Sequence, residues 1–299
     1  MIQLEVEKTE PLAIETSIDP RRVTIERTRT QTLMGNIVKF ADLFSERIAL
    51  KIMYRLFFRV QRVNSTEKHQ KFYSMGIQFK FTFEDKQIAV YEFGKSGKNV
   101  LVLHGWDSIA YHMKEIIQGL VESQFRVVAV DLPGHGDSEG KTTNGIEVVR
   151  LISRLNEKYD FIGVVGHSFG GACAIMSSVQ LLGERKVVAI SSPLNFLTVL
   201  ETFSATLNLR ENLMKRYLSY LNEKFDADLE DWDVSRKNLE GGNSYMVIHD
   251  DDDVLVPFKI ELANSIENVR ILRTKGLGHA MIVRDKGVIT SVVDFMSGR

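Results

Sequence analysis

A glycine-flanked serine at position 168 restricts the folds open to this chain more than any other feature. The run Phe161-Ile-Gly-Val-Val-Gly166 is apolar and β-branched, and it stops at His167-Ser168. Small residues with a helical pattern follow, from Phe169-Gly170-Gly171 to Ile175. An apolar strand, a sharp G-x-S-x-G turn and a helix in this order form a nucleophile elbow, in which a strained turn exposes the serine hydroxyl. The alternative is a glycine-rich turn whose serine only caps the helix.

Composition and charge exclude several classes of protein. The chain has 299 residues, of which 44% are hydrophobic and 26% charged, as in ordinary globular proteins. Its formal net charge of -1 gives no electrostatic attraction to nucleic acid, so we expect no nucleic-acid partner. A single cysteine, Cys173, excludes an internal disulfide and a cysteine-rich metal site. Residues 1–10 lack the pattern of a secretory leader, and together with the single cysteine this favours a reducing, cytoplasmic location.

The N-terminal segment has a pattern of its own. Residues 1 to about 32 are polar without clear periodicity and are predicted to form a loosely ordered arm. Residues 36–60 form a predicted helix whose apolar side chains recur every three or four positions: Ile37, Phe40, Ala41, Phe44, Ile48 and Ile52. A basic stripe follows another side of this helix: Arg47, Lys51, Arg55 and Arg59. The two faces together would permit weak docking on a membrane surface. The simpler interpretation, which we favour, is a helix that packs on the main domain and leaves a solvated basic edge.

From residue 76 onward the pattern predicts a sheet. Residues 77–83 and 87–93 alternate apolar and polar side chains on either side of a turn, which predicts a hairpin. Short apolar runs separated by helical patterns suit strands buried on both faces, at 99–103, 126–130, 187–190, 244–249 and 269–273. This alternation predicts a mostly parallel sheet with helices on both faces. Residues 195–242 are too long for a connecting loop and are predicted to form a helical cap. A last helix is predicted from about Met281 to Met296.

Several motifs occur in the order that one family shares. They are Asp131-Leu-Pro-Gly-His-Gly-Asp-Ser138, the elbow at Ser168, Asp253-Val-Leu-Val-Pro257 and Gly276-Leu-Gly-His279. From about Gly76 to the C-terminus the chain resembles the α/β-hydrolase superfamily, in its serine-nucleophile, esterase- and lipase-like branch. The resemblance implies an α/β fold with a mostly parallel sheet of the eight-stranded type. Residues 71–299 would form this domain, with the cap at 195–242, and residues 1–70 would form an N-terminal arm and helical extension.

The resemblance also implies a catalytic triad. Family members place the nucleophile, the acid and the histidine in that chain order, which here gives Ser168, Asp253 and His279. The acid comes from four consecutive aspartates, of which Asp253 has the expected position four residues before a proline, and Asp251 is the alternative. A serine hydroxyl needs a base to remove its proton, and the histidine needs a carboxylate that fixes its orientation.

Other residues would support the triad. By resemblance, the backbone amides of Trp106 and Phe169 form the oxyanion hole, while the Trp106 indole either lines the pocket or packs. Family members often carry a small residue just after this point, whereas this chain has Asp107-Ser108, which would change the width and polarity of the pocket mouth. Structural roles are expected for His104, His249 and the 131–138 loop. Asp250 and Asp252 are interpreted as turn-forming residues, solvated or bonded to loop amides.

A serine at the elbow argues for acyl transfer, because relatives that attack alkyl halides or epoxides carry aspartate there. We therefore predict a serine hydrolase that cleaves a carboxylic ester or related acyl bond of a small-molecule substrate through an acyl-enzyme. The same triad could serve acyl transfer, perhydrolysis, or C–C or amide cleavage, and a non-catalytic binding module is a further alternative. No motif resembles a nucleotide-binding loop or a zinc site, and residues 250–253 lack calcium-loop spacing, so neither cofactor nor metal is expected. The sequence leaves the oligomeric state open.

Overall fold

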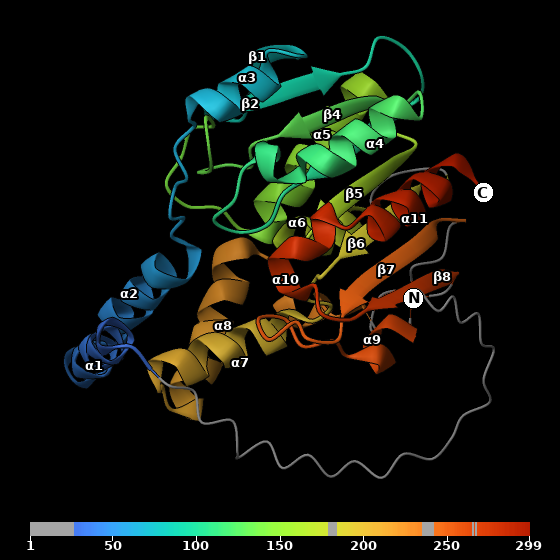
Figure 1. Cartoon of the computed structure of the whole chain (residues 1–299). Coiled ribbons are helices and arrows are strands. Elements are labelled where there is room, and N and C mark those ends of the chain that lie inside the picture. The colour runs from blue at the N-terminus through green and yellow to red at the C-terminus, as the bar shows by residue number, and fades with distance from the viewer. Residues whose placement is uncertain (1–26, 179–183, 235–241, 265, 267) are drawn as a thin grey trace.

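One sheet organises the molecule (Figure 1). The computed structural model describes residues 27–178, 184–234, 242–264, 266 and 268–299. Within these residues the sheet has eight strands in the order β1-β2-β4-β3-β5-β6-β7-β8; β1–β2 and β2–β4 pair antiparallel, and the other neighbours pair parallel. The strands are β1 (Ile77–Phe83), β2 (Lys86–Phe93), β3 (Asn99–Leu103), β4 (Arg126–Val130), β5 (Gly163–His167), β6 (Lys186–Ile190), β7 (Ser244–Asp250) and β8 (Val269–Thr274). The predicted α/β fold with a mostly parallel sheet is confirmed.

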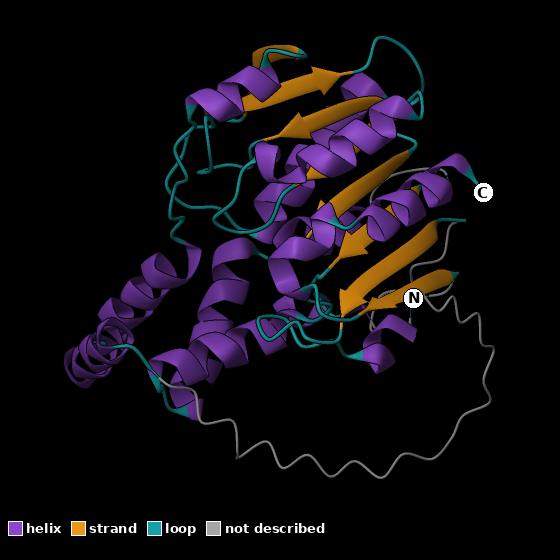
Figure 2. Cartoon of the chain, viewed as in Figure 1, coloured by secondary structure: helices purple, strands orange, loops and turns teal. Residues whose placement is uncertain are grey.

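Helices cover both faces of the sheet (Figure 2). One face packs against α4 (Lys114–Glu122) and α11 (Lys286–Ser297), and the other against α5 (Gly145–Tyr159) and α6 (Phe169–Ser178). Successive side chains of a strand point to opposite faces, so Val100 and Val102 join the first apolar cluster, whereas Leu101 and Leu103 join the second. Burial on both faces explains why these strands read as continuous apolar runs rather than alternating ones.

The cap combines two distant parts of the chain. The insertion supplies α7 (Phe196–Leu207), α8 (Glu211–Phe225) and the short 3₁₀ helix η3 (Leu229–Asp231), and the N-terminal segment supplies α1 (Arg29–Phe44) and α2 (Glu46–Phe58). Buried side chains from both parts form one apolar cluster: Val38, Leu50, Met53 and Phe58 with Leu200, Leu213, Tyr217, Leu221 and Leu229. A Cβ at Gly35 would lie 2.0 Å from the carbonyl oxygen of Leu207, so α1 approaches α7 too closely for any other residue. Residues 235–241 of the predicted cap lie outside the described residues.

The N-terminal helices differ from the predictions in two respects. The single helix expected over residues 36–60 is two helices, because Ser45 has an extended backbone (φ -162°, ψ 111°) that ends α1 and begins α2. Residues 29–32, expected in a loose arm, are helical, since Thr28 forms a capping box with Gln31 that satisfies the first amides of α1. The remainder of the predicted arm, residues 1–26, lies outside the described residues.

The N-terminal segment packs on the rest of the protein, as expected, and Ile52 of the predicted apolar stripe takes part in this packing. The expectation is wrong for four other members of the stripe, Ile37, Phe40, Phe44 and Ile48. These side chains are 47% to 75% exposed, and the buried positions of the two helices are others, among them Val38, Leu50 and Met53. The break at Ser45 rotates α2 relative to α1, so one periodic pattern across residues 36–60 does not describe one face.

Smaller elements complete the chain. The sequence did not predict α3 (Glu67–Tyr73), and the last helix, expected from Met281, is divided. The structure has α10 (Gly278–Met281), the 3₁₀ turn η5 (Ile282–Arg284) and then α11, whose N-cap Asp285 accepts a hydrogen bond from the amide of Val288 at 3.0 Å. The 3₁₀ turn η2 (Ala110–Met113) precedes α4, and α9 (Ile260–Asn264) follows Pro257. Among the described helices none is long and apolar enough to cross a membrane.

Buried histidines hold the loops that follow β3 and β4 against each other. The imidazole Nε2 of His104 accepts a hydrogen bond from the amide of Leu132 at 2.9 Å, and Nε2 of His135 accepts one from the amide of Asp107 at 3.1 Å. Both rings are fully buried. Burial disfavours the protonated form and lowers the pKa of each ring to about 3. Two neutral imidazoles therefore fix the segment that contains Trp106.

Acidification should destabilise the fold through these two buried histidines. An unfolded histidine has a pKa of about 6.5. Between pH 6.5 and 5, His104 and His135 therefore bind protons only when the chain unfolds. The free energy of unfolding falls as the pH falls, with a slope for each ring that approaches about 1.4 kcal/mol per pH unit towards pH 5. We expect His135→Asn to reduce this slope by about one proton in urea unfolding measured across that range. An unchanged slope would show that His135 is protonated in the folded protein.

Candidate active site

Ser168 lies on a strained turn between β5 and α6. Its backbone is left-handed, with φ at +51°, which is uncommon for a residue other than glycine. The flanking glycines are required by space: a Cβ at Gly166 would lie 2.4 Å from the backbone of Gly170, and one at Gly170 would lie 2.5 Å from the carbonyl oxygen of His104. The Ser168 hydroxyl forms no hydrogen bond with another described residue, so the alternative in which it only caps α6 has no support. The turn has the geometry expected of a nucleophile elbow.

Asp253 and His279 are hydrogen-bonded to each other. The Nδ1 atom of His279 lies 2.8 Å from Oδ2 of the buried Asp253, whose other oxygen accepts the amides of Leu255 and Val256, each at 3.0 Å. Burial on its own would raise the pKa of Asp253, but the hydrogen bonds from His279 and these amides outweigh it, and the pKa lies below its usual value. An ionised Asp253 that accepts the Nδ1 proton leaves Nε2 of a neutral His279 free to act as a base.

The other candidate acid lies elsewhere. Asp251 pairs with Arg273 at 2.8 Å, and its side chain is about one-third exposed. Within the described residues it forms no hydrogen bond or ion pair with His279. The structure therefore pairs the histidine with Asp253, which the sequence favoured, and not with the alternative.

A neighbouring histidine ties His279 to the elbow. The Nε2 atom of His167 lies 2.8 Å from the backbone carbonyl oxygen of His279, so this nitrogen carries the proton and donates. The two rings are 4.9 Å apart between centroids. Burial and the nearby His279 lower the pKa of His167 to about 4, so the ring is neutral at ordinary pH. Ser168 itself forms no hydrogen bond to His279 within the described residues; such contacts often tighten only when substrate binds.

Two supporting residues were missed or underrated by sequence reasoning. His167 is one, because only the fold brings it to residue 279. Asp250, interpreted as a turn former, is fully buried and holds the histidine loop. It accepts the amides of Leu277 and Gly278 at 3.1 and 2.9 Å and the hydroxyl of Thr274 at 2.7 Å. Burial would raise its pKa, but these donors lower it. The one sign of this role in the sequence is that an apolar strand ends at Asp250.

The expected brace at His249 is present. Its Nε2 atom lies 2.6 Å from the carbonyl oxygen of Val256, and its ring stacks on Phe258 with centroids 4.8 Å apart. Burial lowers the pKa of His249. The ring therefore holds the turn that presents Asp253.

The two residues whose amides are expected at an oxyanion hole, Trp106 and Phe169, lie next to each other. Phe169 is the first residue of α6, so its N–H has no partner inside the helix. Trp106 follows β3, and its ring meets that of Phe169 edge to face at 5.0 Å. The unusual Asp107-Ser108 pair turns away from the cavity, since Asp107 accepts the amide of Gln61 at 2.7 Å and Ser108 contacts His112 at 2.8 Å. Neither residue is among those that line the described cavity, so the pair does not make its wall more polar.

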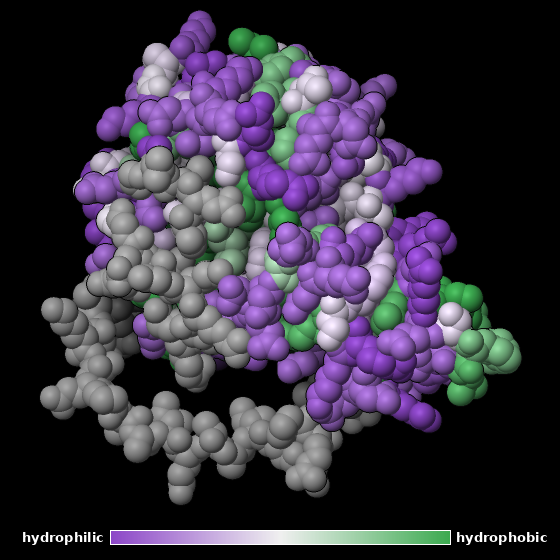
Figure 3. Space-filling model, turned by 180° about the vertical axis from the view of Figure 1, so that it is seen from behind, coloured by the Kyte–Doolittle hydropathy of each residue, from purple (hydrophilic) through white to green (hydrophobic). Residues whose placement is uncertain are grey.

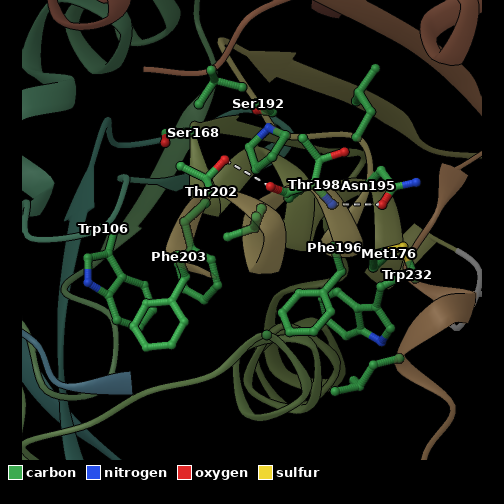
Figure 4. Close-up of a pocket in the computed structure, with 18 of the residues that line it drawn as sticks. Trp106, Ser168, Met176, Ser192, Asn195, Phe196, Thr198, Thr202, Phe203 and Trp232 are labelled. Atoms are coloured by element: carbon green, nitrogen blue, oxygen red, sulfur yellow. Dashed lines mark hydrogen bonds between the residues drawn. The ribbon is translucent and has the colours of Figure 1, made fainter. Parts of the chain in front are cut away.

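Ser168 opens into an apolar cavity of about 440 Å³ beneath the cap (Figure 4). Figure 4 shows Trp106 and Phe203 close together on one side and Phe196 beside Trp232 on the other. The N-terminal helix α2 adds Leu56, Phe57 and Phe58 to the wall. Trp106 both lines the cavity and packs against the cap cluster, so the two roles weighed for its side chain coexist.

A metal site is not formed by the residues described. No group of three or more histidine, cysteine or acidic side chains is placed to hold an ion there. The chemistry available to the site is that of a serine, an imidazole, a carboxylate and backbone amides.

Known proteins resemble this chain in sequence and in fold. Residues 100–290 match the model of the "Alpha/beta hydrolase family". A Pyrococcus furiosus esterase, Pf2001, superposes with a TM-score of 0.61 at 21% identity, over 80% of this chain and 98% of that one. A soluble epoxide hydrolase of Corynebacterium sp. is 42% identical over 85 residues, which is 26% of this chain and 29% of that protein. A Danio rerio "Serine hydrolase-like protein" is 26% identical over 160 residues, 50% of this chain and 48% of that one.

The chain spans about a third of the length of the first curated relatives that it matches, from 29% to 38%. The family model, in contrast, extends from β3 into the last helix and includes the elbow, the aspartate loop and the histidine loop. The chain belongs to the α/β-hydrolase family.

Proposed function

We propose that the protein is a serine hydrolase that cleaves carboxylic esters through an acyl-enzyme. The observation that carries this proposal is the 2.8 Å hydrogen bond between Asp253 and His279, formed beside an elbow whose serine opens into an apolar cavity. A carboxylate, an imidazole and an exposed serine hydroxyl are the parts that acyl transfer requires.

The mechanism assigns one step to each group. The Nε2 atom of His279 removes the proton from Ser168 as the hydroxyl oxygen attacks the ester carbonyl, and Asp253 stabilises the imidazolium that forms. The amides of Trp106 and Phe169 donate to the developing oxyanion. His279 then protonates the departing alcohol, and the acyl group stays on Ser168. A water molecule, deprotonated by His279, attacks this second ester and releases the acid.

The identity of the nucleophile decides between ester and epoxide chemistry. Attack of a serine oxygen on an epoxide carbon would leave an ether, which has no carbonyl for water to attack. An aspartate nucleophile leaves an ester, and water can hydrolyse it. The partial match to an epoxide hydrolase therefore does not transfer that activity to a chain with Ser168 at the elbow.

The apolar cavity favours an ester whose acyl group is apolar. Its wall is mostly aliphatic and aromatic, with contributions from α2, α7 and η3. Burial of a methylene group is worth about 0.8 kcal/mol, which corresponds to roughly a fourfold change in kcat/KM for each carbon that fits.

Removal of the nucleophile is the first test. Ser168→Ala should lower p-nitrophenyl ester hydrolysis by at least ~10³-fold and abolish labelling by a fluorophosphonate, because the hydroxyl that forms the acyl-enzyme is gone. Ser192→Ala is the matched control, since Ser192 lines the same cavity and donates to the carbonyl of Ile190. Labelling that persists in a folded Ser168→Ala protein would contradict the proposal.

The choice of acid gives a second test. Asp253→Asn should reduce kcat by roughly 10²- to 10⁴-fold, because an amide no longer holds His279 in the required tautomer. Asp251→Asn removes only a partly exposed pair with Arg273, so we expect activity within a few-fold of the unaltered protein. Equal losses in the two variants would argue against Asp253 as the orienting acid.

Acyl-chain preference gives a third test. We expect kcat/KM for p-nitrophenyl esters to rise by roughly fourfold per methylene from acetate until the cavity is filled. Val199→Phe, which narrows the cavity from α7, should weaken the longer esters and spare acetate. Val254→Phe is the control, because Val254 is 86% exposed and lies outside the lining. A maximum at acetate would show that the cavity does not hold the acyl group.

A further inference from the structure

The outer face of the two N-terminal helices carries an apolar surface that the described residues leave uncovered. We call it the outer face, and its members are Leu33, Ile37, Phe40, Leu43, Phe44 and Ile48. Their side chains are 47% to 79% exposed. The rings of Phe40 and Phe44, one turn apart, contact each other at a tilt of 57°, with centroids separated by 4.9 Å. Figure 3 shows apolar side chains gathered at this protruding end of the molecule.

Packing of the cap does not account for this surface. The opposite side of α1 already meets the cap through Val38, which is fully buried, and through the close approach of Gly35 to Leu207. Leu33, Ile37, Phe40 and Phe44 follow one another at spacings of four, three and four residues, so they form one stripe on the solvent side. A helix that buries one stripe in its own protein and presents a second to solvent has an apolar surface available to a partner.

Cations border the outer face. They are Arg29, Lys39, Arg47, Lys51 and Arg55, and none of them forms an ion pair with a described residue. The two acidic residues of these helices, Asp42 and Glu46, are both paired with Arg216 of α8, at 2.7 and 3.6 Å. The border is therefore net positive. It complements a negatively charged partner, and it disfavours a second copy of this chain, because self-association would bring two cationic borders together.

The outer face is coupled to the cavity through α2. Ile48 lies in the first turn of this helix, and Phe57, near its end, lines the cavity above Ser168. Nine residues of helix separate them, or about 14 Å. A flat apolar surface with a cationic border, one helix away from an apolar cavity, fits the interface of an anionic lipid layer.

We propose that the outer face docks the protein on anionic membranes, with the apolar side chains in the interface and the cations against the headgroups. This docking is independent of the catalytic assignment. Apolar insertion and electrostatic attraction each contribute, so removal of either should weaken binding, and added salt should weaken the second.

The test is sedimentation of the full chain with vesicles of phosphatidylcholine alone and with 30% phosphatidylserine, a composition of the order found in anionic leaflets. We expect binding to the anionic vesicles that falls as salt is raised. Phe40→Ser/Leu43→Ser/Phe44→Ser should reduce it by roughly tenfold or more, and Arg47→Gln/Lys51→Gln/Arg55→Gln should remove most of its salt dependence. Every substituted side chain is exposed, so neither variant should unfold the protein.

The matched control is Met75→Ser/Ile77→Ser, which removes two equally exposed apolar side chains beside β1, away from the cap. It should bind as the unaltered protein does, and all variants should hydrolyse a short water-soluble ester at the same rate. Absence of vesicle binding by the full chain would overturn the proposal, as would binding that the triple serine variant retains. A concentration-dependent dimer that this variant abolishes, without vesicle binding, would assign the outer face to a second copy instead.

Discussion

Close backbone contact between β3, β5 and α6 is the constraint on which the site depends. Gly166 and Gly170 touch across the elbow, and Gly170 also touches the carbonyl of His104 at the end of β3. A side chain at either glycine would push the helix away from the strand and separate the Ser168 turn from the loop that carries Trp106. The strain at Ser168 persists because three backbones pack around it, and the same packing holds the Ser168 turn close to the loop that carries Trp106.

The opposite side of the site depends on buried carboxylates. A buried carboxylate is costly unless donors surround it. Asp250 is surrounded by the amides of the histidine loop, and Asp253 by its own turn and by His279. The two acids lie three residues apart, yet their roles differ, because one holds the loop and the other orients the ring. Neither could exchange with Asp251, whose side chain reaches Arg273 at the surface.

The parts that could be predicted from the sequence rest on local patterns. Apolar runs gave the strands, and glycine spacing gave the elbow. The preference for Asp253 over its neighbours came from the resemblance to the family, whose members place the acid four residues before a proline. The features that could not be predicted depend on contacts between distant residues. The contact of His167 with the carbonyl of residue 279 was missed. Asp250 was expected to be either solvated or bonded to loop amides, but only the fold shows that these amides belong to the histidine loop. For a related reason the apolar stripe of α1 was predicted to pack on the protein, although it faces solvent. Periodicity shows that side chains share a face, but it does not show which face meets the protein.

The two sides of the N-terminal helices lie in different surroundings. On their inner side they complete the cap, since Leu50, Met53 and Phe58 belong to the same buried cluster as Leu200 and Tyr217. This packing involves one side of each helix. Six large apolar side chains on the other side gain nothing from the cap and would favour unspecific association in water. The cations that border this side form no ion pair with a described residue, because Arg216 engages the nearby acids Asp42 and Glu46, and they give that side a positive charge. Packing in the cap therefore explains the inner face of α1 and α2. The outer face fits a second environment, one that accepts apolar side chains and carries negative charge at its surface.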